Sequence, residues 1–176
     1  MPIYEFEGKR PEIASDAFVF PDAVIIGEVR IGSGCFVGAG AVLRGDYGRI
    51  IIGAETSVQE GVIMHARKGG LCEVGSRVQC GHGSKYHNCT VRDCAVVGVG
   101  AVVSDFAVVG EWAIVAEGAV VRTRFEVPDG CVVAGVPAKV LGEVDAEMKA
   151  LWDEYKDTYA DLARRRYPAG LKRLDL

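Results

Sequence analysis

The stretch that decides the fold runs from Val91 to Val133 and reads VRDCAVVGVGAVVSDFAVVGEWAIVAEGAVVRTRFEVPDGCVV. Within it a valine occurs at every sixth position without a break, at 91, 97, 103, 109, 115, 121, 127 and 133. A short strand with one branched apolar residue pointing inward, followed by a corner, is typical of a parallel β-helix when it recurs every six residues. Three such sides close one coil, which buries its inner face only against neighbouring coils. The sequence therefore predicts a triangular, stacked prism.

The six-residue step continues upstream with three interruptions. Apolar residues follow it at Ile25, Ile31, Val37 and Leu43, at Ile52, Val58 and Met64, and at Val74, Cys80 and Tyr86. The interruptions are nine residues from Leu43 to Ile52, ten from Met64 to Val74 and five from Tyr86 to Val91. A glycine often follows the apolar residue, and it permits a corner because it has no Cβ. The longest interruption predicts a loop over residues 66–73.

A different period begins after the last repeat. Apolar residues then recur at spacings of three and four, at Met148, Leu151, Trp152, Tyr155, Tyr159 and Leu162. This spacing predicts an amphipathic helix over residues 145–166 whose apolar stripe packs along the prism. Asp145 is the expected N-cap, and Pro168 and Gly170 are expected to end the helix. We therefore expect two units, a β-helix over residues 1–142 and a C-terminal α-helical unit over residues 143–176.

Composition narrows the function classes. The chain has 176 residues, 49% of them hydrophobic, and a formal net charge of −4. Such a chain has ample material for a core, and its mild acidity argues against nucleic-acid binding. No apolar run approaches the roughly 18 residues that a membrane span needs, and residues 1–10 lack the apolar core of a secretory signal. We expect a protein without a membrane segment, and a cytoplasmic location follows as the default.

The six cysteines, at positions 35, 72, 80, 89, 94 and 131, form no CxxC pair. We interpret them as reduced, mostly buried side chains rather than as a disulfide framework or a thiolate metal site.

The repeat also predicts where the three histidines lie. His65 follows Met64 and His87 follows Tyr86, so both take the same place in the repeat, one coil apart on one side of the prism. Arg44 belongs to the same column, one coil before His65. The two histidines should therefore be stacked.

His82 falls on the preceding side of the prism, and the same register places Gln59 and Glu60 one coil before it. Histidines on two sides of one prism are far apart, whereas a threefold trimer brings the corner of one subunit against the face of the next. The prediction is an interfacial site with His65 and His87 from one chain and His82 from its neighbour.

Three neutral imidazoles with an open fourth position are the ligand set of a catalytic metal, which lowers the pKa of a bound water to about 7. The alternative is that the three are ordinary polar residues on the surface of a solenoid. Cys80 takes the inward position of its repeat, so we do not expect it to be a ligand.

Several short motifs together resemble the gamma-class carbonic anhydrase family. They are Arg44-Gly45-Asp46, Val58-Gln59-Glu60, Met64-His65, Gly81-His82-Gly83, Tyr86-His87-Asn88-Cys89 and Gly135-Val136-Pro137-Ala138-Lys139. The similarity spans about residues 8–142, and the terminal helix is also similar. The resemblance implies a left-handed helix, a hand that the period alone does not show. It further implies a homotrimer with interfacial zinc sites, with iron or cobalt as alternatives, that catalyses the reversible hydration of CO2 to bicarbonate.

The resemblance also suggests roles for individual residues. Arg44 and Asp46 would form an ion pair between subunits, or serve only as structural bracing. Gln59 would bind the metal-bound hydroxide or orient CO2, with plain corner packing as the alternative. Glu60 stands where the family usually has Asp, which puts its role in doubt. Tyr159 matches a helix tyrosine that reaches towards the site in relatives, and its alternative role is in the core.

One departure from the family affects the expected rate. The stretch Ala66-Arg67-Lys68-Gly69-Gly70 contains no acid, whereas the founding archaeal enzyme carries a glutamate proton shuttle in this loop. Without a shuttle, turnover should be slow. Some relatives are named ferripyochelin-binding proteins, and others are carnitine-operon or phenylacetate-pathway proteins with acyl-CoA thioesterase activity. Residues 44–50 look closest to the last group.

Three alternatives to CO2 hydration therefore stay open. The same site could hydrolyse an acyl-CoA thioester. A hexapeptide acyltransferase would instead need one histidine as a general base. A noncatalytic protein would bind a siderophore or another metal complex.

Overall fold

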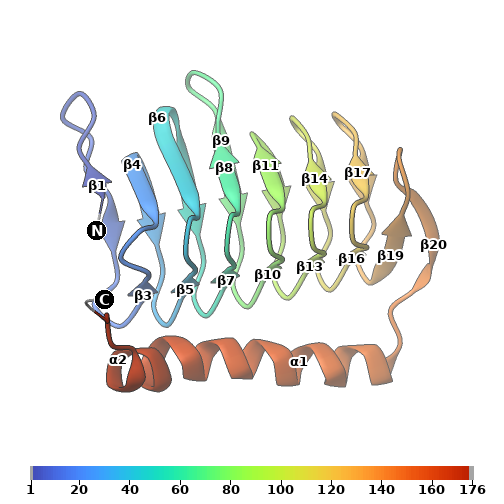
Figure 1. Ribbon diagram of the computed structural model, residues 1–176. Coiled ribbons are helices and arrows are strands. Elements are labelled where there is room, and N and C mark those ends of the chain that lie inside the picture. The colour runs from blue at the N-terminus through green and yellow to red at the C-terminus, as the bar shows by residue number, and fades with distance from the viewer. Residues whose placement is uncertain (1, 175–176) are drawn as a thin grey trace.

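The computed structural model describes residues 2–174. It is a left-handed parallel β-helix of about seven turns with a helical segment at the C-terminus, as the sequence predicted (Figure 1). Within the described residues no helix has the length and apolarity needed to cross a membrane.

The strands form two sheets. The first sheet contains β1 (Ile3–Tyr4), β2 (Glu12–Ile13), β4 (Val24–Ile31), β6 (Val42–Ile52), β8 (Ile63–His65), β9 (Leu71–Val74), β11 (Lys85–His87), β12 (Thr90–Val91), β14 (Val102–Val103), β15 (Val108–Val109), β17 (Val120–Val121) and β18 (Glu126–Val127). The second sheet contains β3 (Phe18–Val19), β5 (Phe36–Val37), β7 (Ser57–Val58), β10 (Gln79–Cys80), β13 (Val96–Val97), β16 (Ile114–Val115), β19 (Cys131–Ala134) and β20 (Lys139–Glu143). The pairs are parallel except β19 with β20.

These sheets make three faces. Strand β6 pairs with β8 through one end and with β9 through the other, so the first sheet bends around a corner. We call its halves the β8 face (β8, β11, β14, β17) and the β9 face (β9, β12, β15, β18), and the second sheet the β10 face. The histidine-pair corner lies between the β8 and β9 faces, the helix corner between the β9 and β10 faces, and the His82 corner between the β10 and β8 faces.

The valine ladder is the core. All eight valines are at most 2% exposed, and equivalent valines on neighbouring coils are register partners, such as Val97 with Val115 and Val115 with Val133. Cys80 continues the same column and is fully buried. The loop predicted within residues 66–73 is also present, between β8 and β9.

Glycine fixes the His82 corner. Gly83 has a φ of +67°, and a Cβ added there would meet no atom within 4 Å. Backbone conformation, rather than lack of space, therefore favours glycine at this position. Because Gly83 completes the turn, His82 sits at its apex, at the edge of the β10 face.

The C-terminal segment runs back along the helix corner (Figure 1). It consists of α1 (Ala146–Asp161), a π-helical turn (Leu162–Arg166) and α2 (Tyr167–Gly170). The predicted N-cap is confirmed, because the Asp145 carboxylate accepts a hydrogen bond of 2.8 Å from the Met148 N–H. The prediction that Pro168 ends the helix was wrong. Pro168 lies in the first turn of α2, where a helix does not need the N–H that proline lacks.

Helix α1 buries only part of its predicted apolar stripe against the prism. Lys156 is 2% exposed and Ala160 is also buried, whereas Leu151 and Tyr155 are about half exposed. Tyr159 does reach the prism, where its ring centroid lies 5.3 Å from that of Phe36. Part of the predicted apolar stripe therefore faces outward along the edge of the β10 face.

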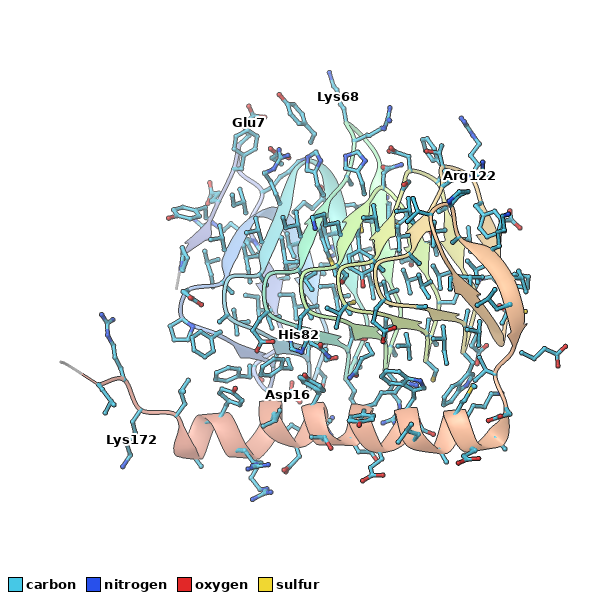
Figure 2. All side chains as sticks on the ribbon, turned by 45° about the vertical axis from the view of Figure 1, so that its right-hand side comes forward. Glu7, Asp16, Lys68, His82, Arg122 and Lys172 are labelled. Atoms are coloured by element: carbon cyan, nitrogen blue, oxygen red, sulfur yellow. The ribbon has the colours of Figure 1, made fainter. Side chains whose placement is uncertain are left out.

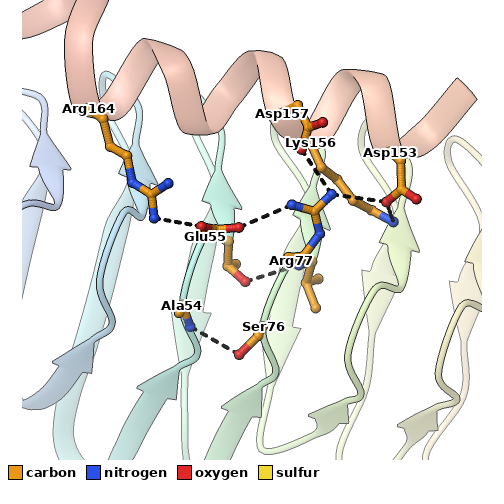
Figure 3. Close-up of polar contacts among 10 residues, drawn as sticks. Ala54, Glu55, Ser76, Arg77, Asp153, Lys156, Asp157 and Arg164 are labelled. Atoms are coloured by element: carbon orange, nitrogen blue, oxygen red, sulfur yellow. Dashed lines mark hydrogen bonds and ion pairs between the residues drawn. The ribbon is translucent and has the colours of Figure 1, made fainter. Parts of the chain in front are cut away.

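Charged side chains hold the helix against the helix corner (Figure 3). The Arg77 guanidinium contacts Glu55 at 3.1 Å, Asp153 at 3.1 Å and Asp157 at 3.0 Å. Arg164 contacts the other oxygen of Glu55 at 2.6 Å. The network ties two helical segments to two neighbouring coils.

The buried Lys156 is paired with the backbone of the prism. Its Nζ donates a hydrogen bond of 2.9 Å to the Cys94 carbonyl and lies 3.9 Å from the centroid of the Trp112 ring. Burial lowers the pKa of Lys156, and these contacts compensate part of the lost hydration.

The ladder yields a prediction about stability. Val97→Ala removes two buried methyl groups from the middle of the stack and should lower the free energy of unfolding by about 2 kcal/mol. Val99→Ala removes the same atoms from a half-exposed corner and should cost less than about 0.5 kcal/mol. Urea unfolding of both variants at one protein concentration checks the difference. Equal losses in the two variants would contradict the prediction that burial of Val97 in the core stabilises the fold.

The ion-pair network yields a second prediction. Hydrogen bonds from Arg164 and Arg77 outweigh burial and lower the pKa of Glu55 below its ordinary value of 4.5. This depressed pKa stabilises the fold above about pH 4.5, and the contribution is lost as the pH falls further. Arg77→Gln should therefore cost about 1–2 kcal/mol at pH 7 and less at pH 4.

Arg165→Gln is the matched control, because among the described residues Arg165 pairs only with Asp161, at 2.7 Å and within the same helical segment. Its stability should be indistinguishable from that of the parent protein at both pH values. Urea unfolding at pH 7 and pH 4 measures the effect. A loss for Arg77→Gln that is the same at both pH values would contradict the role of Glu55.

Candidate metal site at the histidine-pair corner

The two stacked histidines lie where the repeat predicts them. His65 ends β8 and His87 ends β11, and the two are direct register partners. Arg44 in β6 is the partner of His65 on the other side. The strand spacing of about 4.8 Å therefore brings together residues that are 22 positions apart in the sequence.

Their ring nitrogens form an ordered chain of contacts. His65 Nδ1 and His87 Nε2 face each other at 3.1 Å. The other nitrogen of each ring contacts a carboxylate, His65 Nε2 at 3.0 Å from Asp46 and His87 Nδ1 at 2.9 Å from Asp105. Ionised carboxylates accept hydrogen bonds, so in two neutral rings the outer nitrogens carry the hydrogens. The facing nitrogens then present two lone pairs to the same point.

Such a pair of lone pairs suits a metal ion. Two nitrogens bound to a tetrahedral zinc at 2.0–2.1 Å lie roughly 3.3 Å apart. The 3.1 Å between His65 and His87 is close to that separation. Metal-binding histidines almost always give their other ring nitrogen to a carboxylate or carbonyl, as both rings do here. The pair thus fits two ligands of one metal ion.

Both carboxylates are held in their ionised form. Burial works to raise the pKa of Asp46, but hydrogen bonds from Arg44, the Tyr47 N–H and His65 outweigh it and lower this pKa. For Asp105 the largest effect is the hydrogen bond from Arg67, which together with His87 lowers the pKa against burial. Both groups therefore stay negative at neutral pH and can fix the tautomers of the two rings.

Arg44 and Asp46 form an ion pair within one chain. Arg44 Nη1 lies 2.6 Å from Asp46 Oδ2, and the pair between subunits that the family resemblance implies stays a prediction. The physical reason is local, because residues two apart in a strand point to the same side. The pair needs no second chain to form, and it anchors the carboxylate that holds His65.

The third histidine has a carboxylate of its own. His82 Nδ1 lies 2.6 Å from Glu60 Oε2, which confirms that Glu60 sits next to His82 one coil before it. The longer side chain of Glu60 therefore does reach the ring. The His82 side chain is half exposed, and it projects from the edge of the prism that faces α1 (Figure 2).

His82 does not meet the other two histidines within one chain. It occupies the His82 corner, and the pair occupies the histidine-pair corner at the far edge of the β8 face. Among residues 2–174 no group of three or more His, Cys, Asp or Glu side chains of one chain is placed to hold a metal ion. The pair needs a further ligand from elsewhere, and the shared site between subunits stays a prediction.

A groove beside His82 is lined by Gln59 and Tyr159, two further residues that the sequence places at the candidate site. It has a volume of about 380 Å³, and its lining includes Gln59, Gln79 and His82 from the prism and Trp152, Tyr155 and Tyr159 from α1. Gln59 and Gln79 are each only 4% exposed. Burial, with a contribution from Glu60, raises the pKa of the Tyr159 hydroxyl, so this hydroxyl stays protonated. Gln59 and Tyr159 thus belong to the His82 end of the candidate site.

Sequence reasoning missed two parts of this arrangement. Asp105 was overlooked, although the register that places His87 also places Asp105 on the neighbouring coil at the same corner. The sequence pattern places Trp152 only in the helix stripe, and nothing in the sequence indicates that it lines a groove with His82.

The cysteines are where the sequence predicted. All six are free, and four of them are buried. Burial raises the pKa of Cys80 to about 12, so its thiol is neither an activated nucleophile nor a ready metal ligand.

Known proteins share this fold and much of this sequence. The family model for bacterial transferase hexapeptide (six repeats) matches residues 10–45. The carnitine operon protein CaiE of Salmonella typhi is 41% identical over 170 residues, which is 94% of this chain and 83% of that protein. CaiE of Salmonella agona is 40% identical with the same coverage.

Solved structures agree over most of the chain. A Bacillus cereus protein provisionally described as an acetyltransferase is 30% identical, with a TM-score of 0.91 over 92% of this chain and 94% of its own. A hexapeptide transferase family protein from Anaplasma phagocytophilum is 33% identical, with a TM-score of 0.89 over 93% of this chain and 97% of its own. Together with the six-residue core ladder, these similarities show that the chain belongs to the hexapeptide-repeat family that includes the carnitine operon protein CaiE.

Proposed function

We propose that this protein is a metal-dependent enzyme that adds water to an electrophilic carbon, with CO2 as the first candidate substrate. In this proposal a homotrimer places His65 and His87 of one subunit beside His82 of the next. The observation that carries the proposal is common to all three histidines. Each has one ring nitrogen against a carboxylate, from Asp46, Asp105 or Glu60, and the other nitrogen available.

The donor set suits zinc, with iron or cobalt as alternatives. A metal held by three imidazoles would supply a Lewis acid that lowers the pKa of a coordinated water to about 7. The chain's own contribution is orientation. Asp46 and Asp105 fix the tautomers of His65 and His87, Arg44 and Arg67 hold these two carboxylates in place, and Glu60 lies 2.6 Å from His82 Nδ1.

Gln59 is the residue best placed to orient the substrate on the His82 side. Its amide lies in a nearly buried position in the groove that contains His82. An amide both donates and accepts hydrogen bonds, so it suits a substrate oxygen that becomes more negative as the new bond to carbon forms.

Hydration of CO2 forms one C–O bond and releases one proton, which must leave the site. The loop over residues 66–70 offers no carboxylate to accept it, and Asp105 beside this loop is held by both Arg67 and His87. We therefore expect hydration with slow proton release, which added buffer accelerates.

The first functional prediction concerns metal content. His65→Ala should lose the metal and CO2 hydration together, while Asp105→Asn should keep the site but weaken its metal affinity by about 10–100-fold. Metal per chain is measured by elemental analysis after anaerobic purification, and hydration by stopped flow. Arg92→Gln, on another corner, is the control that should change neither. Full metal content in His65→Ala would overturn the assignment.

A second candidate is acyl transfer or hydrolysis of an acyl thioester. Two features favour it, the apolar groove beside the His82–Glu60 pair and the acetyltransferase description of the Bacillus cereus protein. In acyl transfer, His82 would take the proton of the acceptor hydroxyl or amine while the acceptor bonds to the acyl carbon. The C–S bond then breaks, and the thiolate leaves and receives the proton.

The histidines distinguish the two candidates. A metal-dependent reaction requires all three histidines and stops on chelation, whereas general-base acyl transfer requires His82 alone and tolerates a chelator. Acetyl-CoA turnover is measured for His82→Ala and His65→Ala, with and without EDTA. If the parent protein hydrolyses acetyl-CoA at the metal site, both variants and EDTA should abolish that turnover. Activity lost only in His82→Ala would favour acyl transfer, and stoichiometric metal-complex binding without turnover would favour a noncatalytic protein.

A further inference from the structure

Strand β20 is the outermost strand at the end of the solenoid that the last coil forms (Figure 1). Among residues 2–174 it pairs with β19 and with no other strand. The far edge of such a strand carries backbone N–H and C=O groups without strand partners. All five residues from Lys139 to Glu143 are exposed. Strand β20 therefore presents a free sheet edge beyond the end of the solenoid.

The other edges of the two sheets are protected. Strands β1, β2, β3 and β18 are each only two residues long. The outer side of β17 is covered, because the Val120 N–H donates to the Gly135 carbonyl at 3.0 Å and the Val120 carbonyl accepts from the Ala138 N–H at 2.8 Å. Very short edge strands and covering segments prevent edge-to-edge association. Strand β20 has neither form of protection.

The free edge is apolar at its centre. The register between β19 and β20 shifts within the pair, which leaves Leu141 as an extra residue in a β-bulge. The Leu141 side chain is 69% exposed, and Val140 beside it is 50% exposed. Val136, in the connection that precedes β20, is 74% exposed. Removal of these side chains from water would favour association at this edge.

The charges of β20 are self-complementary. The strand begins with Lys139 and ends with Glu143, two positions on either side of Leu141, and neither makes an ion pair with another residue in the described part of the chain. Two antiparallel β20 strands related by a twofold axis at Leu141 place Lys139 of each copy beside Glu143 of the other. Parallel strands in register would instead bring like charges together. Opposite charges stabilise a cross-strand pair and like charges destabilise it, so the pattern favours the antiparallel arrangement.

From the free edge, its apolar centre and its charges, we infer that β20 joins two copies of this protein end to end, by antiparallel pairing about a twofold axis at Leu141. The same patch of both chains forms the contact, so one contact closes with two chains. None of the three histidines lies in it, and the inference does not rest on the proposed function. If the trimer of that proposal forms, its three β20 strands lie at the same end, and two trimers meet there.

The first test measures the mass of the assembly by sedimentation velocity on the full chain. The parent protein should have twice the mass of Leu141→Lys, because the variant places two like charges against each other on the twofold axis. Leu174→Lys introduces the same charge at a leucine that is 74% exposed and lies outside β20, and it should keep the mass of the parent. Equal masses for the parent and Leu141→Lys at every concentration up to the solubility limit would overturn the inference.

Charge reversal tests the antiparallel pairing. Lys139→Glu and Glu143→Lys should each weaken the association about tenfold, because like charges then face each other at both ends of the contact. The double variant Lys139→Glu/Glu143→Lys should associate as the parent does, because opposite charges face each other again. Lys172→Glu makes the same change of charge outside β20 and should have no effect. A double variant as weak as the single variants would overturn the antiparallel pairing.

A cross-link tests the position of the axis. Directly opposed residues of antiparallel strands have Cα atoms about 4.5–5.5 Å apart, inside the range of about 4.4–6.8 Å that a disulfide spans. Only a residue on the axis lies opposite its own copy, so Leu141→Cys should form a disulfide-linked dimer with diamide on a non-reducing gel.

Val136→Cys is the matched control for the cross-link, because Val136 is equally exposed but lies five positions from the axis. It should run as a monomer on the same gel, as should the parent protein with its own six cysteines. Equal cross-linking of the two variants, or none in Leu141→Cys, would overturn the axis at Leu141.

Discussion

The structure depends on one constraint, the hydrogen-bonded stacking of coils at the spacing of neighbouring β-strands. Equivalent positions of successive coils lie directly above one another, because each coil passes through the same three faces. A residue's position in the repeat therefore determines the column in which it lies. The inward-facing columns contain the valine ladder, and the outward-facing columns at the corners contain polar residues such as the histidines. A residue such as His87 is therefore positioned by the regularity of the core beneath it, as its register with His65 shows.

That regularity explains how much could be predicted from the sequence. The β-helix, the stacking of His65 on His87 and the placement of Glu60 beside His82 all follow from counting in steps of six. Features that depend on packing between distant segments did not follow. The burial of Lys156 and the groove beside His82 arise only when α1 docks, and helical periodicity alone could not select which face of α1 turns inward.

Each of the three histidines has a carboxylate beside one ring nitrogen, although the histidines occupy two different corners. A carboxylate that accepts a hydrogen bond from one ring nitrogen fixes the tautomer and the orientation of the ring. Asp46 and Asp105 are themselves anchored by Arg44 and Arg67. The rings of His65 and His87 are therefore oriented before any ligand binds, which lowers the entropy lost when one does.

The path of the C-terminal helix changes how the solenoid should unfold. A stack of coils that contact only their neighbours can fray from either end, one coil at a time. Here α1 begins beside the last coil, and Tyr167, the first residue of α2, packs against Phe18 of an early coil with ring centroids 4.9 Å apart. Unfolding of either end of the stack must also release one end of the C-terminal helical segment. The helical segment thus couples the unfolding of the two ends of the solenoid. A row of coils that could unfold separately becomes a single cooperative unit.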